Sequence, residues 1–210
     1  MKKLFSIIAV VAIALFVFTA CEQISTSGSK KHEFVDLGLS VKWATCNIGA
    51  ETPEAYGDYF AWGEIETKES YDWDTYKYTL ALTKYNKKDS LVVIESVDDI
   101  ATVSWGEGWR IPTKEEQEEL INNCKWYWMK ENGVYGYLIE GVNGNTIFLP
   151  AGGHKNKTDV IKAGEAGFYW SSSLYETSKG SATILYLYAR EKAQTVNNRY
   201  IGANIRPVCK

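Results

Sequence analysis

The fold of this chain is decided by the stretch WGEGWRIPTKEE, Trp105–Glu116. Pro112 disfavours the helical conformation at Ile111, so the residues before it are expected to be extended. Thr113 is suited to be a helix N-cap, and Glu116, three positions later, can reach back to the amide of Thr113 to complete a capping box. The stretch therefore predicts a helix that begins sharply behind a tryptophan-rich turn.

The predicted helix covers Lys114–Asn123 and has one apolar face. Leu120, Ile121 and Cys124 fall on this face, whereas most of the glutamates between them lie off it. The aromatic-rich strands that follow can bury their rings by packing around this helix.

A second, shorter helix is predicted at Val97–Trp105, directly before this stretch. Asp98 and Asp99 are suited to cap its first turn. Ile100 and Val103 are expected to point into the core.

Most of the remaining chain is expected to be β-strand and loop, which predicts an α+β domain. Asn132-Gly133 is typical of a turn, and Asn143-Gly144 is a strong hairpin signal. Thr67–Ser90 is expected to be a long surface excursion, and Pro150–Gly167 a polar loop. Strand-like runs occur at Phe34–Leu39, Val41–Cys46, Lys125–Met129, Tyr135–Glu140, Thr146–Leu149, Phe168–Ser173 (a buried turn or strand), Ala182–Ala189 and Ala203–Cys209.

Composition narrows the class of protein. The chain has 210 residues, enough for one good-sized domain, and eight Trp, 14 Tyr and seven Phe favour a β-rich extracytoplasmic module. The net charge is −3 and becomes −5 without residues 1–20, which hold Lys2 and Lys3 and no acid. Nucleic acid and anionic phospholipid are recognised by clustered Lys and Arg, so this balance argues against both as partners.

The N-terminus indicates an exported protein. Lys2 and Lys3 precede an apolar run that is typical of a signal peptide and short for a membrane span. The run ends in FTAC at Phe18–Cys21, which resembles the lipobox of bacterial lipoproteins, although Phe18 stands where Leu is usual. An ordinary secretory signal is the alternative.

The lipobox resemblance implies cleavage before Cys21 and acylation of that residue, which would anchor the protein to a membrane through lipid alone. Glu22 after the cysteine suggests sorting to the outer membrane, and the side it faces stays open. Residues 21–32 are polar and are expected to form a flexible tether to a domain at 33–210.

Three further cysteines would then lie in an oxidising compartment. We favour a disulfide between Cys46 and Cys124, which would stabilise the fold by about 4 kcal/mol on the chain-entropy model. Cys209 could instead bond either partner, and spacing does not decide between them.

Motifs in a fixed order suggest a family. They are FVDLGLSVKWATCNIGA at Phe34–Ala50, YGDYFAWGE at Tyr56–Glu64, GWRIPTKEE at Gly108–Glu116, NGNTIFLPAGG at Asn143–Gly153, YWSSS at Tyr169–Ser173 and IRPV at Ile205–Val208. Together they resemble the Fibrobacter succinogenes major paralogous domain family. The resemblance implies a C-type-lectin-like or formylglycine-generating-enzyme-like fold. Two helices would flank a small twisted sheet, the first and last strands would pair, and long loops would lie on one side.

Tryptophan and arginine in these motifs are interpreted as structural. Large rings are usually buried with the indole N–H satisfied, so we expect a core role for Trp43, Trp62, Trp105, Trp109 and Trp170. Arg110 and Arg206 are expected to donate forks of hydrogen bonds to carboxylates or carbonyls that fix the turns around them.

A sugar-stacking platform is the functional alternative for other aromatic residues. The candidates lie in polar or alternating sequence and would be informative if exposed: Tyr71, Trp73, Tyr76, Trp126 and Trp128.

No complete catalytic or metal-binding set is evident, so no cofactor or metal is predicted. Residues 153–202 contain no cysteine of the kind a formylglycine-generating enzyme needs, and His154 is the only histidine between residues 33 and 210. Neither a zinc motif nor a Gly-x-Ser-x-Gly nucleophile motif occurs.

The hypothesis is a non-catalytic, lipid-anchored protein that binds carbohydrate or protein through its loops at Tyr71–Tyr85, His154–Gly167 and Leu174–Gly180. The alternatives are a structural subunit of an envelope assembly and, third, an enzyme.

Overall fold

The computed structural model describes residues 32–79 and 81–210. The predicted signal peptide, Cys21 and all of the tether except His32 lie outside the described residues. Among the residues described, no helix has both the length and the apolar character needed to cross a membrane.

An antiparallel three-stranded sheet forms the centre of the molecule. It contains β9 (Ala166–Leu174), β10 (Ser181–Tyr188) and β11 (Glu191–Asn198), with β10 in the middle. Alternate residues of β10 enter different core clusters, because side chains along a strand point to opposite faces. Ile184 joins a first core cluster with Trp62 and Trp170, and Leu185 joins a second with Trp43 and Leu120. The sheet is therefore covered on both faces.

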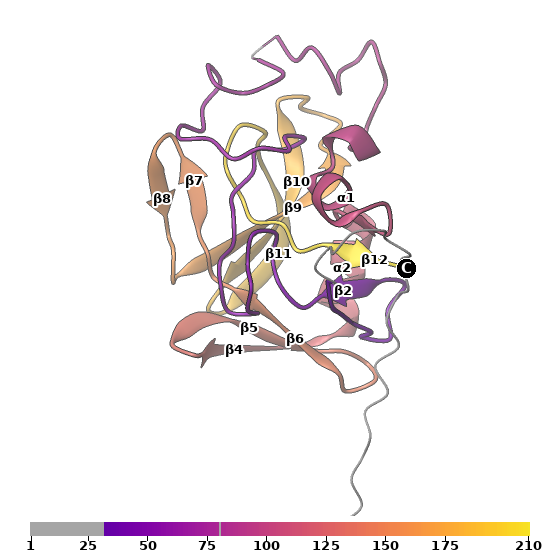
Figure 1. Ribbon diagram of the computed structural model, residues 1–210, viewed down its shortest axis with the longest axis vertical. Coiled ribbons are helices and arrows are strands. Elements are labelled where there is room, and N and C mark those ends of the chain that lie inside the picture. The colour runs from indigo at the N-terminus through magenta and orange to yellow at the C-terminus, as the bar shows by residue number, and fades with distance from the viewer. Residues whose placement is uncertain (1–31, 80) are drawn as a thin grey trace, which may run out of the picture.

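A second antiparallel sheet contains β4 (Lys125–Glu131), β5 (Val134–Glu140) and β6 (Thr146–Pro150), joined by hairpins at the two predicted turns. The long segment that follows Glu64 lies at the opposite end of the molecule (Figure 1). A small hairpin of β7 (His154–Asn156) and β8 (Asp159–Ile161) occupies the predicted polar loop.

The third sheet joins the two ends of the domain in the order β1-β2-β12-β3. Its strands are short: β1 is Phe34–Val35, β2 is Lys42–Ala44, β3 is Trp109–Arg110 and β12 is Val208–Cys209. The prediction that the first and last strands pair is wrong in detail. Val208 pairs with Trp43 of β2 on one side and with Arg110 of β3 on the other, so β2 separates β12 from β1.

Each α-helix begins directly after a residue whose side chain caps it. Helix α2 covers Lys114–Asn123, and the capping box between Thr113 and Glu116 is formed as predicted. Asp99 is the N-cap of α1 (Ile100–Trp105), where its carboxylate accepts hydrogen bonds from the first amides. The preceding turn, η1 (Ser96–Asp98), is 3-10.

The expected inward position of Val103 is wrong, because α1 is short and buries only its first turn. Val103 is 51% exposed, whereas Ile100 and Ala101 are buried.

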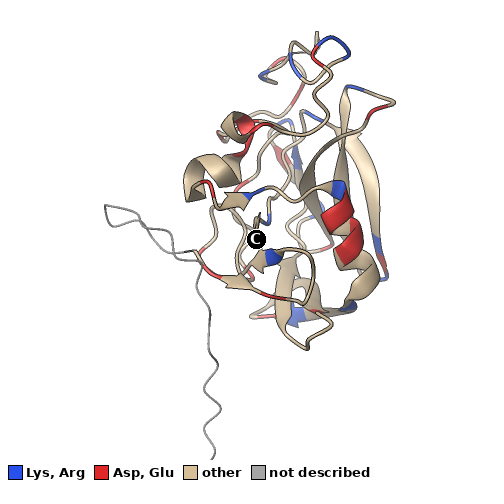
Figure 2. Cartoon of the chain, turned by 90° about the vertical axis from the view of Figure 1, so that its right-hand side faces the viewer, with Lys and Arg blue, Asp and Glu red and all other residues tan. Residues whose placement is uncertain are grey.

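The two α-helices and the mostly antiparallel sheets together make this an α+β domain. Figure 2 shows the acidic residues along α2, the most concentrated run of one charge in that view.

The motif tryptophans mostly have the predicted core role. Trp62 and Trp170 are buried and donate their indole N–H groups to carbonyls of Ser171 and Phe60, both at 2.9 Å. Trp43 and Trp109 are also buried. Trp105 differs, because it is only half-buried at the end of α1.

Both motif arginines donate the predicted hydrogen bonds to carboxylates or carbonyls. Arg110 forms a two-pronged ion pair with Glu116, whose carboxylate also completes the capping box. Buried Arg206 donates to Asn47 Oδ1 at 2.7 Å and to the carbonyls of Thr45 and Phe148 at 2.8 and 2.9 Å. The last motif is thereby fixed to the first.

The predicted disulfide is wrong, because Cys46 and Cys124 are both free thiols. Cys124 ends α2 and packs against the second core cluster, where burial raises the pKa of its thiol to about 11. Cys46 lies in the turn after β2, beside the hydroxyl of Thr45. Cys209 is buried in the first core cluster.

Candidate functional site

The predicted sugar-stacking residues do not form one surface. Tyr71 and Tyr76 are 0% and 1% exposed and belong to the first core cluster. Trp73 is half-buried and lies edge-on to Tyr76 and Tyr200. Trp126 and Trp128 lie together on β4, at the other end of the molecule (Figure 1). The structure therefore removes Tyr71 and Tyr76 as contact residues.

The loop segments predicted to bind ligand do lie together. Most aromatic rings of the Tyr71–Tyr85 segment are buried, whereas Tyr175 of the Leu174–Gly180 segment is 39% exposed. Tyr71 exchanges backbone hydrogen bonds with Lys157 in the β7–β8 turn. The carbonyl of Lys179 accepts a hydrogen bond from Arg199, which also bonds the Tyr71–Tyr85 segment. The surface of this loop face combines polar side chains with the exposed Val160, Ile161 and Tyr175.

A buried arginine that sequence reasoning missed closes this region. Arg199 is fully buried, and its guanidinium lies over the rings of Trp62, Tyr76, Tyr78 and Tyr85, with 4.8 Å to the centroid of Trp62. It donates to Tyr76 Oη at 2.8 Å and to the carbonyls of Lys84 and Tyr85. These residues, together with Asp98, are called the Arg199 cluster below. Its local sequence, NNRY, carries no sign of burial.

The carboxylate of Asp98 completes the Arg199 cluster at its edge. Buried Asp98 accepts hydrogen bonds from Lys77 Nζ at 2.8 Å, from Lys84 Nζ and from the hydroxyl of Tyr85 at 2.7 Å. Burial opposes ionisation of Asp98, but these donors outweigh it and hold the pKa of its carboxyl well below the usual range.

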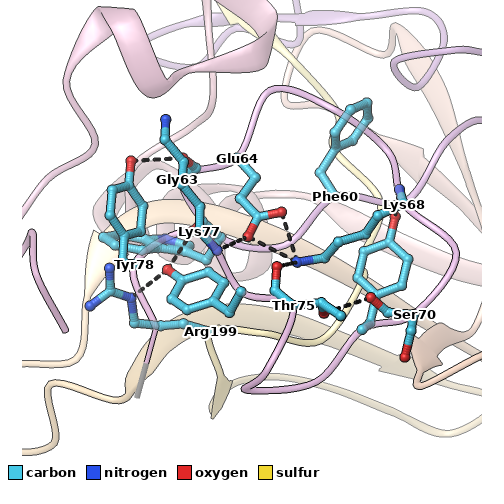
Figure 3. A network of polar contacts seen from close by, with 12 residues as sticks. Phe60, Gly63, Glu64, Lys68, Ser70, Thr75, Lys77, Tyr78 and Arg199 are labelled. Carbon is cyan, nitrogen blue, oxygen red and sulfur yellow. Dashed lines mark hydrogen bonds and ion pairs between the residues drawn. The ribbon is translucent and has the colours of Figure 1, made fainter. Parts of the chain in front are cut away.

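A neighbouring network fixes the start of the long segment (Figure 3). Glu64 accepts a hydrogen bond from the amide of Lys77 at 2.7 Å and pairs with Lys68 at 2.9 Å. Lys68 also donates to the carbonyl of Thr75, and the hydroxyl of Tyr78 donates to that of Gly63. These contacts fold the segment onto the domain, and we interpret them as structural.

An open row of aromatic rings lies on the β4–β5 hairpin. Antiparallel pairing sets Trp128 opposite Tyr137 and Lys130 opposite Tyr135, so their side chains share one face. The ring of Trp128 is parallel to that of Tyr135, with centroids 5.9 Å apart, and lies edge-on to Tyr137 at 5.1 Å. Trp126 lies edge-on to Tyr137 at 5.4 Å. We call Trp126, Trp128, Tyr135 and Tyr137 the aromatic ladder.

One side of the aromatic ladder packs on the domain, and the other side is partly exposed to solvent. Tyr137 is its buried floor and donates its hydroxyl to the carbonyl of Tyr188 at 2.9 Å, while the indole of Trp126 donates to the carbonyl of Leu120 at 3.2 Å. Trp126 and Trp128 stay half-buried, and Tyr135 is 42% exposed. The rings of Trp126, Trp128 and Tyr135 are therefore fixed in position while part of each remains accessible.

Lysines flank the aromatic ladder. Lys130 Nζ lies 4.3 Å from the ring centroid of Tyr135, and Lys192 Nζ lies 5.7 Å from that of Trp126. They supply hydrogen-bond donors beside the apolar surface. The arrangement suits binding of a ligand with a flat apolar face and polar edges.

Within residues 32–79 and 81–210, no group of three or more His, Cys, Asp or Glu side chains is placed to bind a metal ion. Comparison of the chain with protein-family models, curated proteins and solved structures gives no match.

Proposed function

We propose that this protein is a non-catalytic, lipid-anchored envelope protein whose domain binds carbohydrate through the aromatic ladder. One observation carries the proposal: Trp126, Trp128 and Tyr135 are held by packing and pairing on one face of the hairpin, yet remain partly exposed. Exposed aromatic side chains cost free energy in water, so a fixed and open group of them indicates a binding surface.

Carbohydrate fits this surface better than a purely apolar ligand. One face of a pyranose ring presents C–H groups that can pack on an aromatic ring, while its hydroxyl groups need hydrogen-bond partners at the rim. Lys130 and Lys192 lie at the rim of the ladder and can donate to sugar oxygens. Neither lysine is among the ion-paired residues of the described chain.

The location and fold family belong to the same proposal. The lipobox at Phe18–Cys21 supports acylation of Cys21 and attachment to the outer membrane. The ordered motifs support membership of the Fibrobacter succinogenes major paralogous domain family and its C-type-lectin-like fold. The α+β class and the long segment after Glu64 are compatible with that fold.

The experiment is a glycan array probed with the full chain in detergent micelles, followed by titration of any glycan bound. Trp128→Ala removes one stacking surface and should weaken binding about tenfold, the equivalent of about 1.4 kcal/mol. Trp73→Ala, a half-buried tryptophan away from the ladder, is the matched control and should bind as the unmodified chain does. Silence across a diverse array, or equal loss in both variants, would contradict the proposal.

A protein contact is the second candidate function, because the opposite face of the same edge strand is also apolar. Tyr127 and Met129 alternate with the ladder residues along β4 and are 44% and 37% exposed. Crosslinking in intact cells tests for a structural subunit of an envelope assembly. A stoichiometric neighbour that is lost in Tyr127→Ser and kept in Trp128→Ala would favour this function.

A further inference from the structure

A groove beside His32 and α1 shares no residue with the aromatic ladder. Its volume is about 500 Å³, within the range of small-molecule sites. It is lined by Ser104 and Trp105 of α1 and by the chain at Asp58 and at residues 65–67. The apolar side chains of Ile48, Phe60 and Ile100 also line the groove, and His32 lies at its edge.

An imidazole already occupies the aromatic wall of this groove. The ring of His32 stacks on Trp105 with centroids 3.8 Å apart and planes 6° from parallel. Trp109 lies edge-on to both rings, at 6.4 Å from His32 and 5.2 Å from Trp105. His32 belongs to the predicted tether, so the chain supplies a planar nitrogen-containing ring to its own groove.

Two acidic residues, Asp58 and Glu66, also line the groove. Asp58 and Glu66 are both exposed, and the ion pairs formed between described residues include neither. Asp58 is held by backbone: its amide donates to the carbonyl of Ile48 at 2.9 Å. Gly49 has φ +78°, and a Cβ there would lie 2.2 Å from Asp58 Oδ2, so only glycine leaves room for this carboxylate.

We propose that the groove is a second binding site, for a small molecule with a planar nitrogen cation such as an amidinium, guanidinium or imidazolium group. Such a cation gains both the face of Trp105 and the field of Asp58 and Glu66. His32 is the occupant in cis, and an external ligand displaces it. The His32 ring therefore covers Trp105 until ligand arrives. The site is independent of carbohydrate binding at the aromatic ladder.

The test uses the full chain in detergent micelles, with benzamidinium as the cationic probe and benzamide as its neutral match, both titrated by calorimetry. Removal of the competing ring in His32→Ala should raise the affinity for benzamidinium about tenfold, as expected if the groove is about 90% occupied by His32. His154→Ala is the matched control and should leave the affinity unchanged. Equal affinities in His32→Ala and the unmodified chain would overturn the role of His32.

The charge requirement is tested separately in the His32→Ala background. Benzamide should bind several-fold more weakly than benzamidinium, because it lacks the charge that Asp58 and Glu66 attract. Glu66 is exposed, so Glu66→Gln should fold normally and reduce the affinity for benzamidinium alone. Identical binding of the two probes, or equal loss for both in Glu66→Gln, would overturn the proposed ligand class.

Discussion

The Arg199 cluster and the aromatic ladder are built from the same residue types but differ in what closes them. Both combine Trp and Tyr rings in edge-on contact with lysines nearby. In the Arg199 cluster, a guanidinium and the Asp98 carboxylate fill the space between the rings and bury them. The aromatic ladder has no such centre, and its outer rings stay partly exposed. Aromatic content alone therefore does not distinguish core from binding surface.

The largest effect is expected from Arg199→Ala. The substitution leaves the hydroxyl of Tyr76 and the carbonyls of Lys84 and Tyr85 without their donor inside the core. We expect the free energy of unfolding to fall by about 4 kcal/mol, measured by urea denaturation. Arg190→Ala, at an exposed turn, should change it by less than about 0.5 kcal/mol. Similar values for the two variants would mean that Arg199 does not hold its cluster together.

Asp98→Asn should cost less, about 2 kcal/mol at neutral pH, because the charge-assisted hydrogen bonds weaken but the shape is kept. The pKa of Asp98 is lower in the folded than in the unfolded chain, so its stabilisation is complete above the unfolded value of about 3.9 and is lost as the pH falls below it. Urea denaturation from pH 7 to pH 3 should show a shallower acid loss in Asp98→Asn than in the unmodified chain. Asp74→Asn, at an exposed position, is the control and should lose stability in acid as the unmodified chain does. If Asp74→Asn and Asp98→Asn lost the same stability between pH 7 and pH 3, the role of Asp98 would be contradicted.

Trp128→Ala separates binding from stability. The ring is only half-buried, so we expect unfolding to be about 1 kcal/mol easier, against about 4 kcal/mol for Trp62→Ala in the core. Urea denaturation of Trp128→Ala and Trp62→Ala gives the two free energies of unfolding, which are then compared with the effect of Trp128→Ala on glycan affinity. A loss of stability in Trp128→Ala as large as in Trp62→Ala would show that the ladder is core.

The smallest effect is expected from Lys130→Ala. Its ammonium lies over an exposed ring, so unfolding should change by less than about 0.5 kcal/mol. Glycan affinity should fall about fivefold through loss of one hydrogen bond, about 1 kcal/mol. Lys87→Ala, exposed on the long segment, should leave both quantities unchanged.

Local signals predicted the helix and central strand well. The capping box needs only Thr113 and Glu116, four residues of chain, and it fixed the start of α2. The strand-like run Ala182–Ala189 likewise predicted β10, and Ile184 and Leu185 lie on its opposite faces because side chains alternate along a strand.

Contacts between distant segments explain what the sequence did not reveal. The segment around Tyr71 and Tyr76 is locally polar. Tyr76 is nevertheless buried against Arg199, and buried Tyr71 is paired with Lys157, both far away in the sequence. Strand β11 is polar and was not among the predicted strands, but Gln194 bonds the carbonyl of Lys114 in α2. Both features depend on the tertiary fold, to which composition in a short window is insensitive.

The most direct test uses the side-chain indole N–H signals of the eight tryptophans in a ¹H–¹⁵N spectrum of the full chain, before and after addition of a bound glycan. Trp126 and Trp128 belong to the aromatic ladder, so their signals should shift while those of Trp62 and Trp170 stay in place. Shifts at Trp62 or Trp170 with none at Trp126 and Trp128 would contradict the assignment of the ladder as the binding surface.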